Sequence, residues 1–89
     1  MAHMIIRHKV EDFDGWKPEF DDHRPAREAA GLRDLYLWRN ADDSNEIILL
    51  MEASNLEKAR EFAASSDLGD KMRSAGVLGA PDIVFLSEL

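Results

Sequence analysis

Apolar residues recur with helical spacing over residues 14–31, and this stretch predicts a single bent helix. At about 100° per residue, its side chains divide into two faces. Pro18 and Pro25 lie on one face and are expected to bend the helix away from it. The opposite face is expected to pack on a sheet, and it places a histidine and an arginine in the same layer as three aromatic rings: Phe13, Trp16, Phe20, His23, Arg27 and Ala30.

The period of the pattern changes to that of β-strands in four other segments. In residues 4–10, Ile6, His8 and Val10 share one face, and the intervening residues share the other. Further strands are expected over residues 33–39, 46–52 and 83–86. The turn formers at residues 40–45 predict a hairpin with a longer loop between the second and third strands.

Residues 54–76 predict two shorter helical pieces. Ser54 and Glu57 have the spacing of a capping box at the start of the first piece. Its buried stripe is expected to contain Leu56, Ala59, Phe62 and Ala63, and a second piece carries Leu68, Met72 and Ala75 before Gly76 ends it. Residues 77–82 contain Gly and Pro and are expected to form a connector.

The predicted order is strand, helix, strand, strand, helix, strand. This order is typical of the α+β ferredoxin-like βαββαβ fold, a four-stranded antiparallel sheet with its helices on one face. Residues 47–51 and 83–86 are apolar at consecutive positions, so both faces of the sheet are expected to be covered. A second sheet packed across a twofold axis is the simplest cover for the helix-free face, which predicts a homodimer.

Composition and net charge limit the cellular environment and the binding partners that are expected for the protein. The chain of 89 residues forms one expected domain over residues 4–89, and residues 1–3 are expected to derive from a cloning site. A formal net charge of −7 disfavours nucleic acid and anionic lipid as partners. No apolar run reaches the length of a membrane span, and no export signal is recognisable, so a cytoplasmic protein is expected. The absence of cysteine excludes disulfides and thiolate metal sites.

Three groups of residues resemble those of a known superfamily. They lie on the first helix, in the hairpin and in the second helical region: Trp16, Lys17, Phe20, His23, Arg27 and Gly31; Arg39, Asn40 and residues 42–46; Ala59, Phe62, Ala63, Ser65 and residues 72–81. Over residues 4–89 the chain resembles the dimeric α+β barrel proteins, specifically the small antibiotic biosynthesis monooxygenase-like and cyclase branch. The resemblance implies cofactor-independent action on aromatic or polyketide-like molecules, and hence no cofactor.

His23 and Arg27 are the candidate catalytic pair. His23 has a pKa near neutrality and is suited to remove a proton from an acidic C–H or O–H. Its structural alternative is a hydrogen bond to the carbonyl of Asp21, which Pro25 cannot bond. Arg27 is suited to stabilise the resulting oxyanion. Its alternative is a salt bridge to Glu28, Asp34 or an acid of a partner chain, or a side chain that extends to solvent.

The apolar layer around this pair is the candidate ligand pocket. His8 is expected to approach His23 if its strand face meets the helices, but two histidines without a third ligand do not predict a metal site. The other candidate ligand-binding residues are large and apolar: Trp16, Phe20, Trp38, Phe62, Met72 and Phe85. A non-catalytic ligand-binding or interaction module on the same dimer is the alternative to an enzyme, and it would lack a cavity on which His23 and Arg27 converge.

Overall fold

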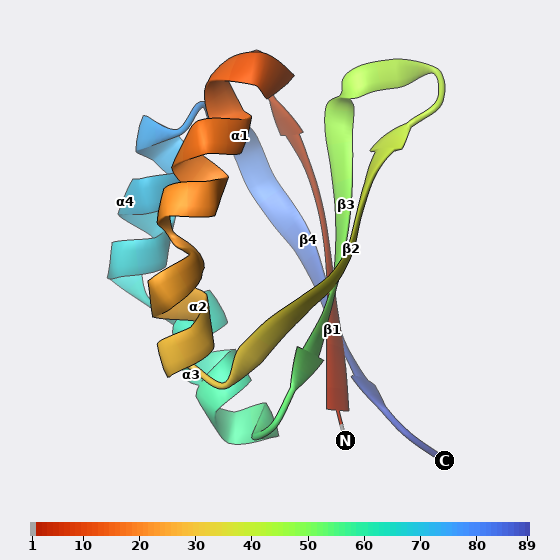
Figure 1. Cartoon of the computed structure of the whole chain (residues 1–89), viewed down its shortest axis with the longest axis vertical. Coiled ribbons are helices and arrows are strands. Elements are labelled where there is room, and N and C mark those ends of the chain that lie inside the picture. Colours follow the sequence, from red (N-terminus) through yellow and green to blue (C-terminus); the bar gives the residue numbers. More distant parts are fainter. Residues whose placement is uncertain (1) are drawn as a thin grey trace.

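Four strands form one antiparallel sheet in the order β2-β3-β1-β4, and four helices cover one of its faces (Figure 1). The computed structural model describes residues 2–89. The strands are β1 (Ala2–Val10), β2 (Leu32–Asn40), β3 (Asp43–Ala53) and β4 (Val77–Ser87), and the helices are α1 (Phe13–Asp22), α2 (Arg24–Ala29), α3 (Leu56–Ala64) and α4 (Ser66–Ser74). The predicted ferredoxin-like α+β fold is confirmed. Of the three residues assigned to a cloning site, Met1 lies outside the described range and the other two begin β1.

The core lies between the helices and the inner face of the sheet. Alternate residues of β1, Met4, Ile6, His8 and Val10, are buried there, as their strand periodicity predicts. The central strand β3 alternates in the same way, and every second residue from Ile47 to Ala53 is buried. Trp16 from α1 and Ala59 from α3 join the same cluster. The aromatic stripe of the first helix therefore faces the sheet, as predicted.

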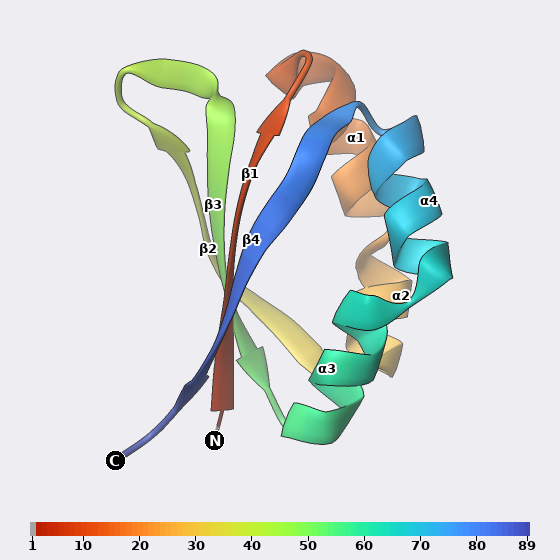
Figure 2. The ribbon, with the colours of Figure 1, turned by 180° about the vertical axis from the view of Figure 1, so that it is seen from behind.

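The outer face of the sheet is covered by no element of residues 2–89 (Figures 1 and 2). Large apolar side chains lie on it nonetheless. Tyr36 and Trp38 of β2 are 58% and 47% exposed and stack with ring centroids 5.0 Å apart, and Val84 of β4 is 51% exposed. Ile48 and Leu50 of β3, which pair with the two aromatic residues, are half-buried. A contiguous apolar surface of this kind is unusual on a monomeric soluble domain.

The prediction of one bent helix over residues 14–31 is wrong, because the chain leaves the helical path at His23. The ring of Pro25 has no N–H, so the carbonyl of Asp21 cannot receive the usual helical hydrogen bond. The N–H of His23 instead donates to the carbonyls of Glu19 and Phe20, at 3.2 Å each, which tightens the last turn of α1. Two helices result, and His23 lies at their junction.

The prediction of a connector at residues 77–82 is also wrong, because these residues begin β4. β4 is an edge strand, where the missing N–H of Pro81 removes no necessary pairing. Gly79, with φ +68°, lies where the register against β1 shifts between Arg7 and Lys9. The glycine and proline therefore mark an irregular edge strand and not a loop.

Two local predictions about ends of elements are corrected as well. The β2–β3 turn contains only residues 41 and 42, because Asn40 pairs with Asp43, so the longer hairpin loop is absent. The N-cap of α3 is Asn55, whose side chain accepts a hydrogen bond from the N–H of Lys58 at 3.1 Å. Ser54 does not cap the helix; its hydroxyl donates to the carbonyl of Gly31 at 3.2 Å.

Candidate functional site between the sheet and the helices

A cavity of about 60 Å³ lies between the inner face of the sheet and the helices. This volume exceeds the roughly 10 to 15 Å³ that a single water requires but is below the roughly 150 Å³ of a cavity that holds benzene, so a ring bound here must extend through the open rim. β1 and β3 form its floor, and all four helices contribute to its walls. Most of the lining is apolar: Ile6, Leu49 and Met51 from the sheet, and Trp16, Phe20, Phe62, Leu68, Met72 and Ala75 from the helices. The charged or titratable lining residues are His8, Glu19, His23, Arg27 and Lys71.

His8 is one of two buried polar residues in the lining of this cavity. It projects from β1, its exposed fraction is 5%, and the Trp16 ring packs edge-on against it at 5.5 Å. Neither ring nitrogen has a hydrogen-bond partner, and among residues 2–89 no other side-chain nitrogen or oxygen is buried without one. Burial lowers the pKa of His8 to about 4, so the ring is neutral at neutral pH. A neutral imidazole with an unpaired donor and an unpaired acceptor therefore belongs to the cavity lining.

His23 lies at the rim of the cavity, where it is half-buried. Its ring stacks on Phe62 with centroids 5.9 Å apart. Partial burial lowers its pKa, and the nearby charges of Arg27 and Lys71 act in the same direction, while Asp67 opposes them. The structural alternative predicted for His23 was a hydrogen bond from its ring to the carbonyl of Asp21. No such bond is found in residues 2–89.

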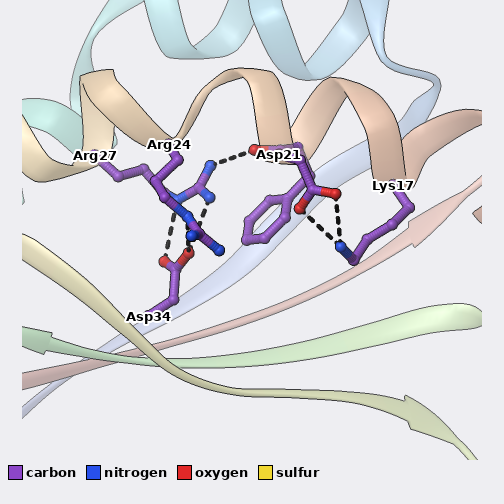
Figure 3. A network of polar contacts seen from close by, with 6 residues as sticks. Lys17, Asp21, Arg24, Arg27 and Asp34 are labelled. Carbon is purple, nitrogen blue, oxygen red and sulfur yellow. Dashed lines mark hydrogen bonds and ion pairs between the residues drawn. The ribbon is translucent and has the colours of Figure 1, made fainter.

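Arg27 is buried at the inner end of α2, and its guanidinium is held by three groups (Figure 3). Nε and an Nη donate to the two carboxylate oxygens of Asp34 at 3.1 and 2.9 Å. The other Nη donates to the carbonyl of Phe20 at 2.7 Å, and the guanidinium carbon lies 3.7 Å from the centre of the Phe20 ring. The structure therefore shows the salt bridge to Asp34, which was one of the structural alternatives predicted for Arg27.

The Arg27 network also explains why the first helix is divided stably at His23. The Phe20 carbonyl lies in the last turn of α1, where it also accepts from the N–H of His23 at 3.2 Å. Arg27 supplies a charged donor to it from the next helix and is anchored to β2 through Asp34. Arg24 adds a weaker, exposed ion pair to Asp34 at 3.8 Å, and Lys17 pairs with Asp21 one turn further along α1 at 2.7 Å (Figure 3).

The structure brings together seven of the nine predicted site residues: His8, Trp16, Phe20, His23, Arg27, Phe62 and Met72. Trp38 does not line the cavity, because its strand register opposite Ile48 directs it to the outer face of the sheet. Phe85 does not line it either. Its ring packs at the margin of the core under the guanidinium of Arg60 at 4.5 Å.

The sequence interpretation did not include Glu19 or Lys71. Both lie on exposed helix positions, and helical periodicity alone indicates solvent for such residues. Glu19 precedes Phe20 on α1, and Lys71 precedes Met72 on α4, so each is adjacent in sequence to a wall residue that was predicted. In each case an exposed, charged residue adjoins a half-buried wall residue.

Residues 2–89 contain no group of three or more His, Asp or Glu side chains arranged to hold a metal ion. None of the helices in that range is long and apolar enough to cross a membrane.

Solved structures share this fold at low sequence identity. A Bordetella bronchiseptica protein assigned to the antibiotic biosynthesis monooxygenases superposes with a TM-score of 0.77 and 14% identity, covering 99% of this chain and 96% of that chain. A variant of SnoaB, a cofactor-independent oxygenase from Streptomyces nogalater, gives 0.72 and 13%, covering 98% and 91%. An uncharacterized NIPSNAP domain protein from Burkholderia xenovorans gives 0.65 and 11%, covering 100% and 94%.

No protein-family model and no curated protein matches the sequence. The similarity to antibiotic biosynthesis monooxygenase-like structures is thus a similarity of fold.

Proposed function

We propose that the protein binds a small aromatic or polyketide-like molecule in the cavity between sheet and helices and acts on it as a cofactor-independent oxygenase or cyclase. The observation that carries this proposal is His8. A buried imidazole with two unpaired nitrogens costs stability, on the order of 1 to 3 kcal/mol for each unpaired group. A ligand whose polar group reaches this ring removes that cost, while its apolar part contacts Trp16, Phe20 and Phe62.

In this proposal the two histidines have different roles. The low pKa of His8 makes it a weak base but leaves it neutral and able to orient a ligand by hydrogen bonds. His23 at the rim takes a proton from an acidic O–H or C–H of the ligand. Because its ring is half-buried and not sealed from water, the imidazolium that forms can release the proton to solvent. Arg27 is a positioning residue, because Asp34 and the Phe20 carbonyl already hold its guanidinium.

A non-catalytic ligand-binding module is the second candidate, and the state of Arg27 favours it. An oxyanion formed in the cavity would need a free cationic donor, and the one buried cation in the lining is paired with a carboxylate. In this alternative His8 still binds the ligand, but no chemical reaction follows.

Binding and turnover are tested separately. In a Trp38→Phe background the remaining tryptophan, Trp16, lines the cavity, so its fluorescence reports occupancy. We expect phenols, quinones or small lactones to quench it and to raise the melting temperature, since a ligand at 100 times its Kd adds about 2.7 kcal/mol. His8→Phe should abolish both effects. A panel that leaves the fluorescence and melting of both proteins unchanged would contradict the proposal.

Turnover is followed as oxygen uptake and as product mass for every ligand that binds. His23→Gln should abolish turnover and leave the fluorescence quench intact. If ligands bind and none is converted by the wild-type protein, the non-catalytic alternative is the correct one.

We also propose that the protein is a homodimer assembled through the outer face of the sheet. The support is the apolar surface formed by Tyr36, Trp38 and Val84 with Ile48 and Leu50. Charged side chains on the same face pair within the chain: Arg7 with Glu46 at 3.6 Å, Lys9 with Asp43 at 3.5 Å and Arg33 with Glu52 at 3.3 Å. A partner sheet would therefore meet apolar side chains together with charges that already have partners.

A further inference from the structure

We propose that the cavity binds rings in their neutral, hydroxyl-bearing form and rejects the corresponding phenolate or carboxylate. This inference rests on the proposed function and specifies the class of ligand for the same site. It follows from the state of each charged or titratable group that faces the cavity from the elements packed around it.

The interior of the cavity contains no uncompensated positive charge. His8 on β1 is neutral, as its lowered pKa of about 4 requires. Arg27 on α2 is buried, and its guanidinium is already ion-paired with Asp34 at 2.9 Å. From α1 the charged lining residue is Glu19, which would repel an anion, and α3 contributes only Phe62. An anion placed beside His8 would therefore be desolvated without a counter-charge, which costs several kcal/mol.

Lys71 on α4 is the one cation of the lining without a salt bridge in residues 2–89. Its side chain is exposed and lies at the rim, so water screens its charge and it acts little on a group bound beside His8. Arg27 and, to a smaller extent, Lys71 lower the pKa of His23, which is also at the rim. The positive field of these two cations therefore acts on the rim beside His23.

The hydrogen-bonding capacity of His8 points to a hydroxyl group. A neutral imidazole has one N–H donor and one acceptor nitrogen, and both are unpaired. A hydroxyl is both a donor and an acceptor, so it can use either nitrogen of the ring. A carboxylate or phenolate can only accept, so it can pair with the N–H alone and never with the acceptor nitrogen.

The experiment uses 4-nitrophenol, whose pKa lies near neutrality and whose visible absorbance reports the fraction ionised. Binding of the neutral form alone must raise the apparent pKa of the ligand. We expect added protein to bleach the phenolate band at constant pH. In parallel, 4-methylphenol should bind about tenfold or more tightly than toluene or benzoate, ring compounds of similar size, since a lost hydrogen bond is worth this factor.

Two variants assign the effect to His8. His8→Phe, or His8→Leu if the first fails to fold, should remove both the bleaching and the preference for 4-methylphenol over toluene. Lys58→Gln, at an exposed position of α3 outside the cavity lining, is the matched control and should preserve both. An unchanged or lowered pKa of bound 4-nitrophenol, benzoate binding equal to that of 4-methylphenol, or bleaching that persists without His8 would each overturn the inference. Toluene binding would then still support the proposed function, whereas failure of every ring compound to bind would overturn both.

Discussion

Two buried polar side chains on the inner layer, His8 and Arg27, are in opposite states. Arg27 has a carboxylate, a carbonyl and an aromatic face around it, while His8 has only apolar neighbours and a cavity. The first arrangement stabilises the fold, since it joins α1, α2 and β2. The second costs stability in the absence of a ligand, which is typical of a residue retained for binding.

The pH dependence of stability should report the burial of His8. Its pKa is about 4 in the folded chain against 6.5 for an exposed histidine. Below pH 6.5 the unfolded chain therefore binds a proton that the folded chain excludes, and stability is lost as the pH falls toward 4. This loss should be on the order of 3 kcal/mol. Urea unfolding at pH 7 and pH 4.5 should show a larger loss for wild type than for His8→Phe, in which the carboxylates still titrate. An equal loss in the two proteins would contradict the prediction.

At the residue scale, helical and strand spacing were enough to place His8, His23 and Arg27 in one layer. They were not enough to identify Asp34 as the partner of Arg27 over Glu28 or a partner-chain acid. The register of β2 against β3 is irregular between Asp34 and Tyr36. This irregularity lets Asp34 point to the helices while Tyr36 points outward, although strict alternation would put both on one face. No pattern of residue types marks it.

Element ends depend on single contacts, and Gly31 at the end of the second helix is the clearest case. It has φ +78°, and a Cβ built on it would lie 2.5 Å from Oγ of Ser54. Its carbonyl also accepts from the N–H of Ser54 at 2.9 Å, which ties α2 to the end of β3. The positive φ and the close approach both require glycine.

Replacement of Gly31 by Ala should therefore destabilise the protein by about 1 to 3 kcal/mol. Gly15→Ala is the matched control. Gly15 lies inside α1, its added Cβ would meet only a carboxylate oxygen of Asp12 at 3.5 Å, and this change should stabilise by about 0.5 to 1 kcal/mol. Thermal or urea unfolding of the two variants should give shifts of opposite sign. Shifts of the same sign would mean that Gly31 is not constrained as described.

The sequence predicted the existence of most elements and misplaced several of their ends. Residues 77–82 contain glycine and proline, so composition indicated a loop, but an edge strand needs hydrogen bonds on one side only. Helical spacing continues across His23, so the division of the first helix was hidden, and only the missing N–H of Pro25 indicated a change there. These errors arise where one backbone contact decides the outcome and the side-chain pattern does not.

At the scale of the whole molecule, the exposed outer face of the sheet decides the oligomeric state. Leu50→Asp places a charge at the centre of the proposed dimer interface, opposite Tyr36. In a dimer this change should dissociate or aggregate the protein, because a desolvated charge without a partner costs several kcal/mol. Ser66→Asp, at the exposed start of α4, adds the same charge away from that face and should leave the protein unaffected. Sedimentation of the three proteins at micromolar concentration measures the result, and a monomeric wild type would refute the dimer.

The central position of β1 has a consequence for how the chain acquires its structure during translation. β1 pairs with β3 and with β4, and in the second pair Ala2 lies opposite Ser87. β1 is the first strand to leave the ribosome, and β4 is the last. One edge of β1 therefore stays open, with unpaired N–H and C=O groups, until synthesis of the strand at residues 77–87 is complete. The elements that line the cavity all precede β4 in the chain, so they can assemble while this edge of β1 is still open, and the sheet is complete only when β4 pairs with β1.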